Sequence, residues 1–362
     1  MKKRWLLMGL ASLVGVAALG AAAVCLTSGC SSLGYYAQAA GGHFALLNKA
    51  KPVTEWLADE ATATPLKERL ALSQRMRDFA VSELKLPDNA SYRRYADLGR
   101  NAAVYNVVAA PELSLTLKTW CFPVVGCVGY RGYYDRADAE SLAAELRTQG
   151  FEAVVQSIPA YSTLGKMPGD YFSDPLLNTF LRWQEGDLAR LIFHELAHQV
   201  VYAKGDTMFN ESFATAVERI GGERWMQQHA SEAARAELAR LEQRRQDFRR
   251  LAMQARADLE AVYKDDTLSV EAKRAAKTAR FARLRADHAA LKAGPWQGWT
   301  GYDTWFANAN NASLGVMAAY NELVPQFERL YEREGRDFER FYAEVRRLAA
   351  LPRDERRATL AR

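Results

Sequence analysis

Residues 190–220, RLIFHELAHQVVYAKGDTMFNESFATAVERI, contain the pattern H-E-x-x-H at His194, Glu195 and His198. Residues four apart in an α-helix share one face, so the two imidazoles can hold one metal ion between them. Apolar residues occupy most of the neighbouring positions, which predicts that this helix is buried. The pattern favours a metal site, and the alternative is a buried helix that happens to carry two histidines.

The second half of the same stretch supplies two further carboxylates. A turn at residues 203–208 is expected to end the first helix, and Asn210 to start a second helix that runs back past it. Glu211 stands at the beginning of that helix and can present a third ligand to the metal. Glu218 lies two turns further along the same face, where it can accept a hydrogen bond from a ligand imidazole.

These motifs carry a family resemblance. HELAHQ followed by NESFATAVE resembles the two motifs of the gluzincin metallopeptidases. The resemblance implies one zinc ion bound by His194, His198 and Glu211, with one position left for water. It also implies that Glu195 takes a proton from this water and passes it to the leaving amine.

Other segments resemble a bacterial lipoprotein family labelled as aminopeptidases. They are CSSLGYYAQAAGGHFALLNKAKPV, AYSTLGKMPGD and NNASLGVMAAYNELVP, and together they extend the resemblance over nearly the whole mature chain. Gluzincins use a later tyrosine or histidine to stabilise the oxyanion, and Tyr302 in GWTGYDTWFANANN is the best candidate here. Its alternative role is that of a packed core residue.

The expected fold is α+β, with a zincin-like core in which a mixed sheet accompanies the two ligand helices. The sequence between residues 102 and 158 alternates segments rich in β-branched and aromatic residues with one short helical pattern. We expect the following organisation: a signal peptide at 1–29, an N-terminal helical region at 30–90, the catalytic core at 91–228, a charged helical hairpin at 229–294, and C-terminal helices at 295–362 that complete the catalytic domain.

The expected hairpin is rich in Arg, Glu, Ala and Leu. Heptad spacing predicts two antiparallel helices. One seam includes Phe248 and Leu259, with Arg245 at one of its positions, and the other includes Phe281, Leu284 and His288. His288 is interpreted as a packed histidine. The charges fit a solvated face, and binding of a partner protein is the alternative.

The first thirty residues differ from the rest of the chain. A positive start and a long apolar run are typical of a secretory signal, and LTSGCSS resembles a bacterial lipobox. This resemblance implies that Cys30 is lipidated and that the protein faces the periplasm, anchored in the outer membrane because serine follows the cysteine. An uncleaved anchor helix is the alternative. Removing the signal takes the formal net charge from +5 to +2, which gives no electrostatic footprint for nucleic acid.

Two cysteines then remain as free thiols. Cys121 and Cys127 lie six apart, and a small disulfide loop is expected in an oxidising compartment.

The substrate is a peptide or protein, but the cleaved bond stays open. Tyr161 and Ser162 are expected beside the open metal position, and FPVVGCVGYRGYY can supply an edge strand for a peptide. The G-x-M-E-N motif with which gluzincin aminopeptidases hold a free amine is missing. Its absence favours endopeptidase or oligopeptide cleavage over removal of single N-terminal residues. A lipoprotein that uses the metal site and the hairpin for structure or partner binding, without turnover, is the alternative from another class.

Overall fold

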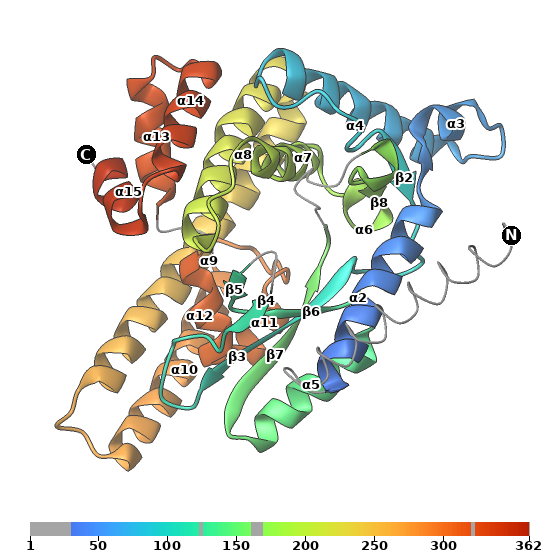
Figure 1. Ribbon diagram of the computed structural model, residues 1–362. Coiled ribbons are helices and arrows are strands. Elements are labelled where there is room, and N and C mark those ends of the chain that lie inside the picture. Colours follow the sequence, from blue (N-terminus) through green and yellow to red (C-terminus); the bar gives the residue numbers. More distant parts are fainter. Residues whose placement is uncertain (1–29, 123–125, 161–168, 320–322, 362) are drawn as a thin grey trace, which may run out of the picture. The chain divides into compact units, whose positions relative to one another are not determined.

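The computed structural model describes residues 30–122, 126–160, 169–319 and 323–361 (Figure 1). The chain divides after Asn48 into two units. The first contains α2 (Cys30–Lys49), and the side chains of its first four residues are not described. The expected signal peptide lies outside the described residues. Among the helices that the structure describes, none is long and apolar enough to span a bilayer.

The second unit, which begins at Lys49, is α+β and mostly helical. Its helices before the hairpin are α3 (Val53–Ala58), α4 (Thr64–Ser82), α5 (Arg136–Thr148), the 3-10 turn η1 (Asp170–Phe172), α6 (Asn178–Leu181), α7 (Glu185–Val200) and α8 (Thr207–His229). The remaining helices are α9 (Glu232–Lys264), α10 (Val270–Ala293), α11 (Asp303–Asn308), α12 (Asn311–Ala319), α13 (Val324–Arg333), α14 (Phe338–Ala349) and α15 (Arg353–Leu360).

The strands of the second unit form three small sheets. They are β1 (Lys51–Pro52), β2 (Arg94–Ala96), β3 (Val104–Pro111), β4 (Trp120–Phe122), β5 (Gly126–Val128), β6 (Arg131–Tyr133), β7 (Phe151–Ile158) and β8 (Leu176–Leu177). The main sheet has the order β6-β3-β7 and is antiparallel. A second sheet, β1-β2-β8, is mixed, and β4 pairs with β5.

The central strand β3 is covered on both faces, and successive residues of the strand point to opposite faces of the sheet. Tyr105, Val107 and Ala109 pack against α5, while Val108 and Ala110 pack against Ala312 of α12. Residues 113–119 lie in the region of 102–158 where strands were expected, but they do not pair in a sheet. Leu115 instead packs against the helices of the hairpin, so its burial there replaces the expected pairing.

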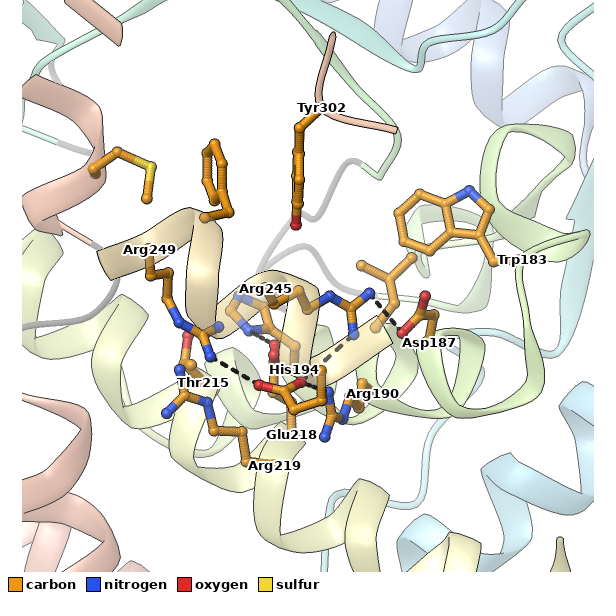
Figure 2. Close-up of a pocket in the computed structure, with 14 residues that line it drawn as sticks. Trp183, Asp187, Arg190, His194, Thr215, Glu218, Arg219, Arg245, Arg249 and Tyr302 are labelled. Carbon is orange, nitrogen blue, oxygen red and sulfur yellow. Dashed lines mark hydrogen bonds and ion pairs between the residues drawn. The ribbon is translucent and has the colours of Figure 1, made fainter. Parts of the chain in front are cut away.

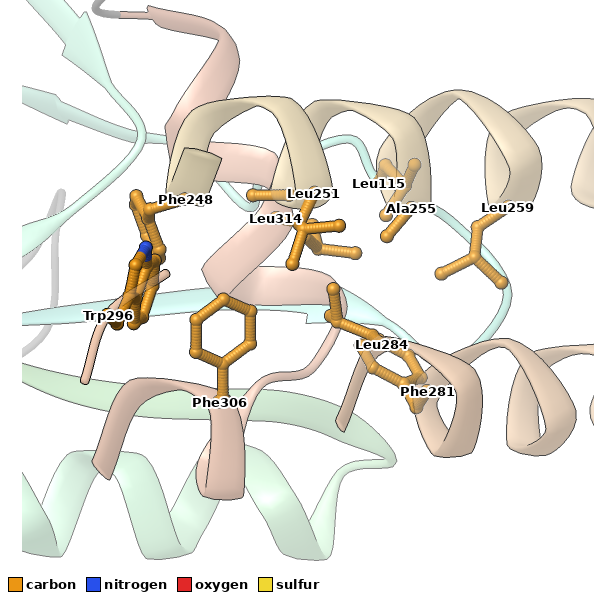
Figure 3. Packing of buried hydrophobic residues seen from close by; sticks show 11 residues of the cluster. Leu115, Phe248, Leu251, Ala255, Leu259, Phe281, Leu284, Trp296, Phe306 and Leu314 are labelled. Carbon is orange, nitrogen blue, oxygen red and sulfur yellow. The ribbon is translucent and has the colours of Figure 1, made fainter. Parts of the chain in front are cut away.

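The hairpin of α9 and α10 is present, and its base belongs to the core of the second unit (Figure 3). Phe248 and Leu259 of α9 pack with Phe281 and Leu284 of α10, as the heptad spacing predicts. Trp296, Phe306 and Leu314, which follow α10 in the chain, join the same cluster. Arg274 also makes two 2.8 Å contacts with Glu112 after β3. The hairpin is therefore anchored along one side rather than projecting freely.

Helices α7 and α8 form the centre of the helical part and run side by side (Figure 1). Two glycines of α8 allow this close approach. A Cβ atom at Gly221 would lie 3.1 Å from Phe193 of α7, and one at Gly222 would lie 2.6 Å from Arg190 of α7. Phe213 of α8 packs on the other side against α13 and α14. The metal motifs therefore lie on a firmly packed helix pair.

Candidate metal centre

The two histidines of α7 and Glu211 of α8 converge on one point. His194 Nε2 lies 3.1 Å from His198 Nε2. Glu211 Oε2 lies 3.4 Å from the first of these nitrogens and 3.6 Å from the second. His198 is buried and the other two side chains are largely buried. The spacing of thirteen residues between His198 and Glu211 thus brings a carboxylate to the two imidazoles, as the sequence predicted.

The positions of these three donor atoms fit a metal ion. Zinc bound tetrahedrally at about 2.0–2.1 Å from each ligand places the donors about 3.3 Å apart, close to the observed separations of 3.1–3.6 Å. Two imidazole nitrogens and a carboxylate oxygen are also a donor set that zinc prefers. The buried His198 Nδ1 has no hydrogen-bond partner among the described residues.

Glu218 fixes the orientation of one ligand. Its Oε2 lies 2.7 Å from His194 Nδ1, so the ring donates its Nδ1–H to this carboxylate. The lone pair of Nε2 then faces His198 and Glu211, which is the tautomer that a metal requires. The predicted contact between Glu218 and a ligand imidazole is therefore present.

The electrostatics of the three residues favour a cation. Burial opposes charge on His194, but contacts with Glu211 and Glu218 outweigh it and raise the pKa of His194 well above its usual value. Burial likewise opposes charge on Glu211, yet its hydrogen bonds with His194 and His198 hold the pKa of that carboxyl far below its usual range. A field that stabilises a proton on the His194 ring also stabilises a metal ion at the same place.

Glu195 lies between the two histidines in sequence and is partly buried. Burial raises the pKa of its carboxyl, although the neighbouring histidines oppose the shift. A carboxylate with a raised pKa is better matched to accepting and returning a proton near neutral pH. Its chemistry and position therefore suit the base that the sequence predicted.

A cavity of about 350 Å³ has His194 and its hydrogen-bond partner Glu218 in its wall, while His198 and Glu211 are not among its lining residues (Figure 2). Tyr302 lines the same cavity, and its hydroxyl points into it. The ring stacks on Phe248 of α9 with 4.2 Å between centroids. Burial raises the pKa of Tyr302 while Arg245 and Arg249 oppose the shift, so the hydroxyl keeps its proton and can donate it in a hydrogen bond. The structure thus brings this tyrosine into the same cavity wall as His194.

Sequence reasoning missed the ion pairs that surround this cavity. Arg245 Nη2 lies 2.8 Å from Asp187 Oδ1, joining the hairpin to α7. Glu242 accepts hydrogen bonds of 2.8 Å from both Arg190 and Arg249. The available signal was Arg245 itself, a charged residue on the apolar seam of a predicted hairpin.

Tyr92 is a second residue that the sequence did not indicate. It is 1% exposed, and its hydroxyl has no hydrogen-bond partner among the described residues. Burial raises its pKa well above the usual value, and the negative charge of Glu195 adds to the shift, which places the phenol near that carboxyl. Its backbone has a φ of 63°, a rare conformation that clusters at functional sites.

Helix α8 begins three residues earlier than expected. Asp206 is its N-cap and accepts a hydrogen bond from Phe209 N at 3.2 Å. Asp206 is buried and also pairs with Arg356 at 2.8 Å and Arg357 at 3.0 Å from α15. Asn210 lies inside the helix, where its amide exchanges two hydrogen bonds with the backbone of Ala203. The asparagine therefore fixes the turn between the two ligand helices rather than capping the second.

The remaining candidate residues lie elsewhere. A disulfide joins Cys121 of β4 to Cys127 of β5. Within the described residues, β6 pairs only with β3 and is thus an edge strand. Tyr161 and Ser162 lie outside the described residues, and Cys30 is the first residue of α2, with its side chain not described.

Fold and site together define an α+β protein with a candidate metal site of three residues on two packed helices. The chain belongs to the family described as "Putative aminopeptidase", whose model matches residues 34–360. No curated protein and no solved structure gives a significant match. The family description indicates a peptidase that acts on peptides.

Proposed function

We propose that the chain is a zinc-dependent peptidase with His194, His198 and Glu211 as the zinc ligands. Membership of the family supports peptidase activity. The observation that carries the zinc assignment is the convergence of the three donor atoms at 3.1–3.6 Å, with Glu218 on the outer nitrogen of His194. A zinc ion held there would acidify a water molecule and polarise the carbonyl of the cleaved bond.

Two residues of the chain would then move or hold protons. Glu195 accepts the proton of the attacking water and returns it to the amine that leaves. Tyr302 donates a hydrogen bond to the oxygen of the carbonyl as negative charge develops on it. Support for the second role is the position of this hydroxyl in the cavity that His194 lines.

The test is metal content together with turnover. We expect about one zinc ion per chain in the purified protein, loss of peptide cleavage with a chelator, and recovery on adding zinc. The variant Glu195→Gln should keep its zinc and its thermal unfolding temperature while kcat falls by about three orders of magnitude or more. Hydrolysis by this variant at the rate of the unchanged protein would rule out the proposed base.

The proposal does not require a free N-terminus in the substrate. A bound ammonium needs a carboxylate partner, since an unpaired buried charge costs several kcal/mol. The carboxylates of Asp187, Glu218 and Glu242 in the cavity each already pair with an arginine or a histidine. We therefore favour cleavage of oligopeptides within the chain over removal of single N-terminal residues.

Comparing one peptide with a free and with an acetylated N-terminus decides between these two modes. Equal cleavage of both forms is expected. Loss of cleavage on acetylation, with single residues released from the N-terminal end, would establish an aminopeptidase in the strict sense.

For location, we propose that lipidation of Cys30 tethers the peptidase to the outer membrane on its periplasmic side. The support is the lipobox-like LTSGCSS with serine after the cysteine. The variant Cys30→Ser should lose labelled fatty acid and leave uncut precursor or soluble protein in cell fractions. Membrane anchorage without labelled lipid on the unchanged chain would favour an uncleaved N-terminal helix instead.

A further inference from the structure

A second cavity lies next to the one that His194 lines. It has a volume of about 600 Å³ and shares Trp183, Asp187 and Arg245 with the first. The first cavity has His194 in its wall, and the second is bounded by residues of α9 that precede Arg245 and by the segment before α7. The two cavities are thus neighbours, and the second lies on the side of the first that is bounded by Trp183, Asp187 and Arg245.

Basic side chains outnumber acidic ones in the walls of both cavities. In the inner cavity, the carboxylates are neutralised by the ion pairs of Asp187 with Arg245 and of Glu242 with Arg190 and Arg249. Burial opposes ionisation of Glu242, but the two arginines outweigh it and lower its pKa to about 2, so these pairs persist at neutral pH. A guanidinium has five N–H donors, and a single carboxylate uses only part of them.

The outer cavity has basic groups with fewer partners. Arg182 and Arg240 are exposed, and their side chains form no ion pair or hydrogen bond with any residue that the structure describes. The guanidinium of Arg244 lies 4.9 Å from the centre of the Trp299 ring, which attracts it without neutralising its positive charge. Positive charge that is not neutralised inside a cleft attracts anions and raises their local concentration.

We propose that the two cavities are a subsite for carboxylate groups, so that the preferred substrates are anionic peptides. This inference rests on the proposed peptidase function, because the ligand is taken to be the peptide beside the metal. Arginine presents a planar fork that matches a carboxylate, and both cavities offer such forks. The carboxylates come from acidic side chains or from the free C-terminus of the peptide.

Binding to the Glu195→Gln variant measures this subsite without turnover. Isothermal titration calorimetry would compare an eight-residue alanine peptide containing four glutamates, its counterpart with four glutamines, and the glutamate peptide with an amidated C-terminus. We expect the glutamate peptide to bind about tenfold more tightly than the glutamine peptide at low salt, with a smaller difference at high salt because exposed charges are screened. If amidation of the C-terminus weakens binding while replacement of glutamate by glutamine does not, the bound carboxylate is that of the C-terminus.

The contribution of individual arginines is tested by substitution in the outer cavity, because changes there leave the ion pairs of α7 intact. The double variant Arg240→Gln with Arg244→Gln should abolish most of the preference for glutamate. Arg285→Gln is the control for each lost charge, since Arg285 is exposed on α10 and lines neither cavity. Equal affinity for the glutamate and glutamine peptides, or an equal effect per charge of the control, would overturn the proposal.

The outcomes also separate this inference from the function on which it rests. Zinc-dependent cleavage of glutamate and glutamine peptides with the same KM would leave the peptidase in place and refute the subsite. Binding that prefers glutamate and depends on Arg240 and Arg244, in a chain that cleaves none of the peptides, would support the subsite and refute the peptidase.

Discussion

Two buried histidines, His198 of α7 and His288 of the hairpin, differ in what their rings face. Their exposures are 6% and 8%, so burial does not distinguish them. His198 Nε2 faces His194 and Glu211. His288 stacks on Phe306 with 4.1 Å between ring centroids, and burial lowers its pKa.

His288 also has a carboxylate nearby, because its Nε2 lies 3.3 Å from Asp303. That carboxylate is shared with Lys292, which supplies a positive charge beside the ring. In the candidate metal site, the neighbour of His198, His194, has carboxylates on two sides, Glu218 and Glu211. The candidate metal site therefore differs from His288 in having donor atoms that converge from two helices with negative charge in excess, and burial of a histidine alone does not produce this arrangement.

The largest difference between the two regions is expected when a proposed carboxylate ligand is removed. Glu211→Ala should lose most of the bound zinc, and turnover should fall by about three orders of magnitude or more because water activation fails. His288→Gln should keep zinc and turnover, since its ring contacts the aromatic cluster of the hairpin. Metal analysis by mass spectrometry beside a peptide cleavage assay measures both. Full zinc occupancy in Glu211→Ala would show that the third ligand has been misassigned.

A smaller effect on zinc binding is expected from a change beside His194 Nδ1, the ring nitrogen that faces away from the proposed metal position. Glu218→Gln should weaken zinc affinity about 10- to 100-fold, because the hydrogen bond that fixes the tautomer of His194 becomes weaker. Asp303→Asn is the matched change beside His288 and should leave zinc affinity unaltered. Competition with a chromogenic chelator gives both affinities. The same affinity in both variants would remove Glu218 from the site.

The smallest effect concerns the link between the two regions, Glu242 of the hairpin with its arginines. Its pKa is lowered from 4.5 to about 2, so the pair stabilises the fold fully above pH 4.5 and this stabilisation is lost as the pH falls toward 2. The contribution is about 2–3 kcal/mol at neutral pH. Glu242→Gln should therefore lower the free energy of unfolding at pH 7 and lose less of it on acidification. Parallel stability curves for both proteins between pH 6 and 3 would contradict this linkage.

The sequence allowed the convergence of the candidate metal ligands to be predicted, because their positions depend largely on local spacing. His194 and His198 share a helix face, and Glu218 follows Glu211 by two turns, so helical geometry alone places them. The seam of the hairpin was predictable for the same reason. The sequence also indicated an α+β fold, which the structure has.

The features that were missed depend on contacts between distant segments. Arg245 meets Asp187 and Tyr92 approaches Glu195 only in the folded chain, and no periodic pattern encodes either meeting. Residues 113–119 have β-forming side chains, yet Leu115 is buried against the hairpin, since tertiary packing overrides local propensity. Asn210 matches a helix start by composition, but Asp206 provides the cap.

The cap of α8 has a consequence for the order in which this part of the fold forms. A chain leaves the ribosome from its N-terminus, so all three metal ligands are synthesised well before Arg356 and Arg357. Until those arginines arrive, Asp206 stands without its buried partners one turn before Glu211. The helix that carries Glu211 therefore gains this buried support only when the last residues of the chain are present.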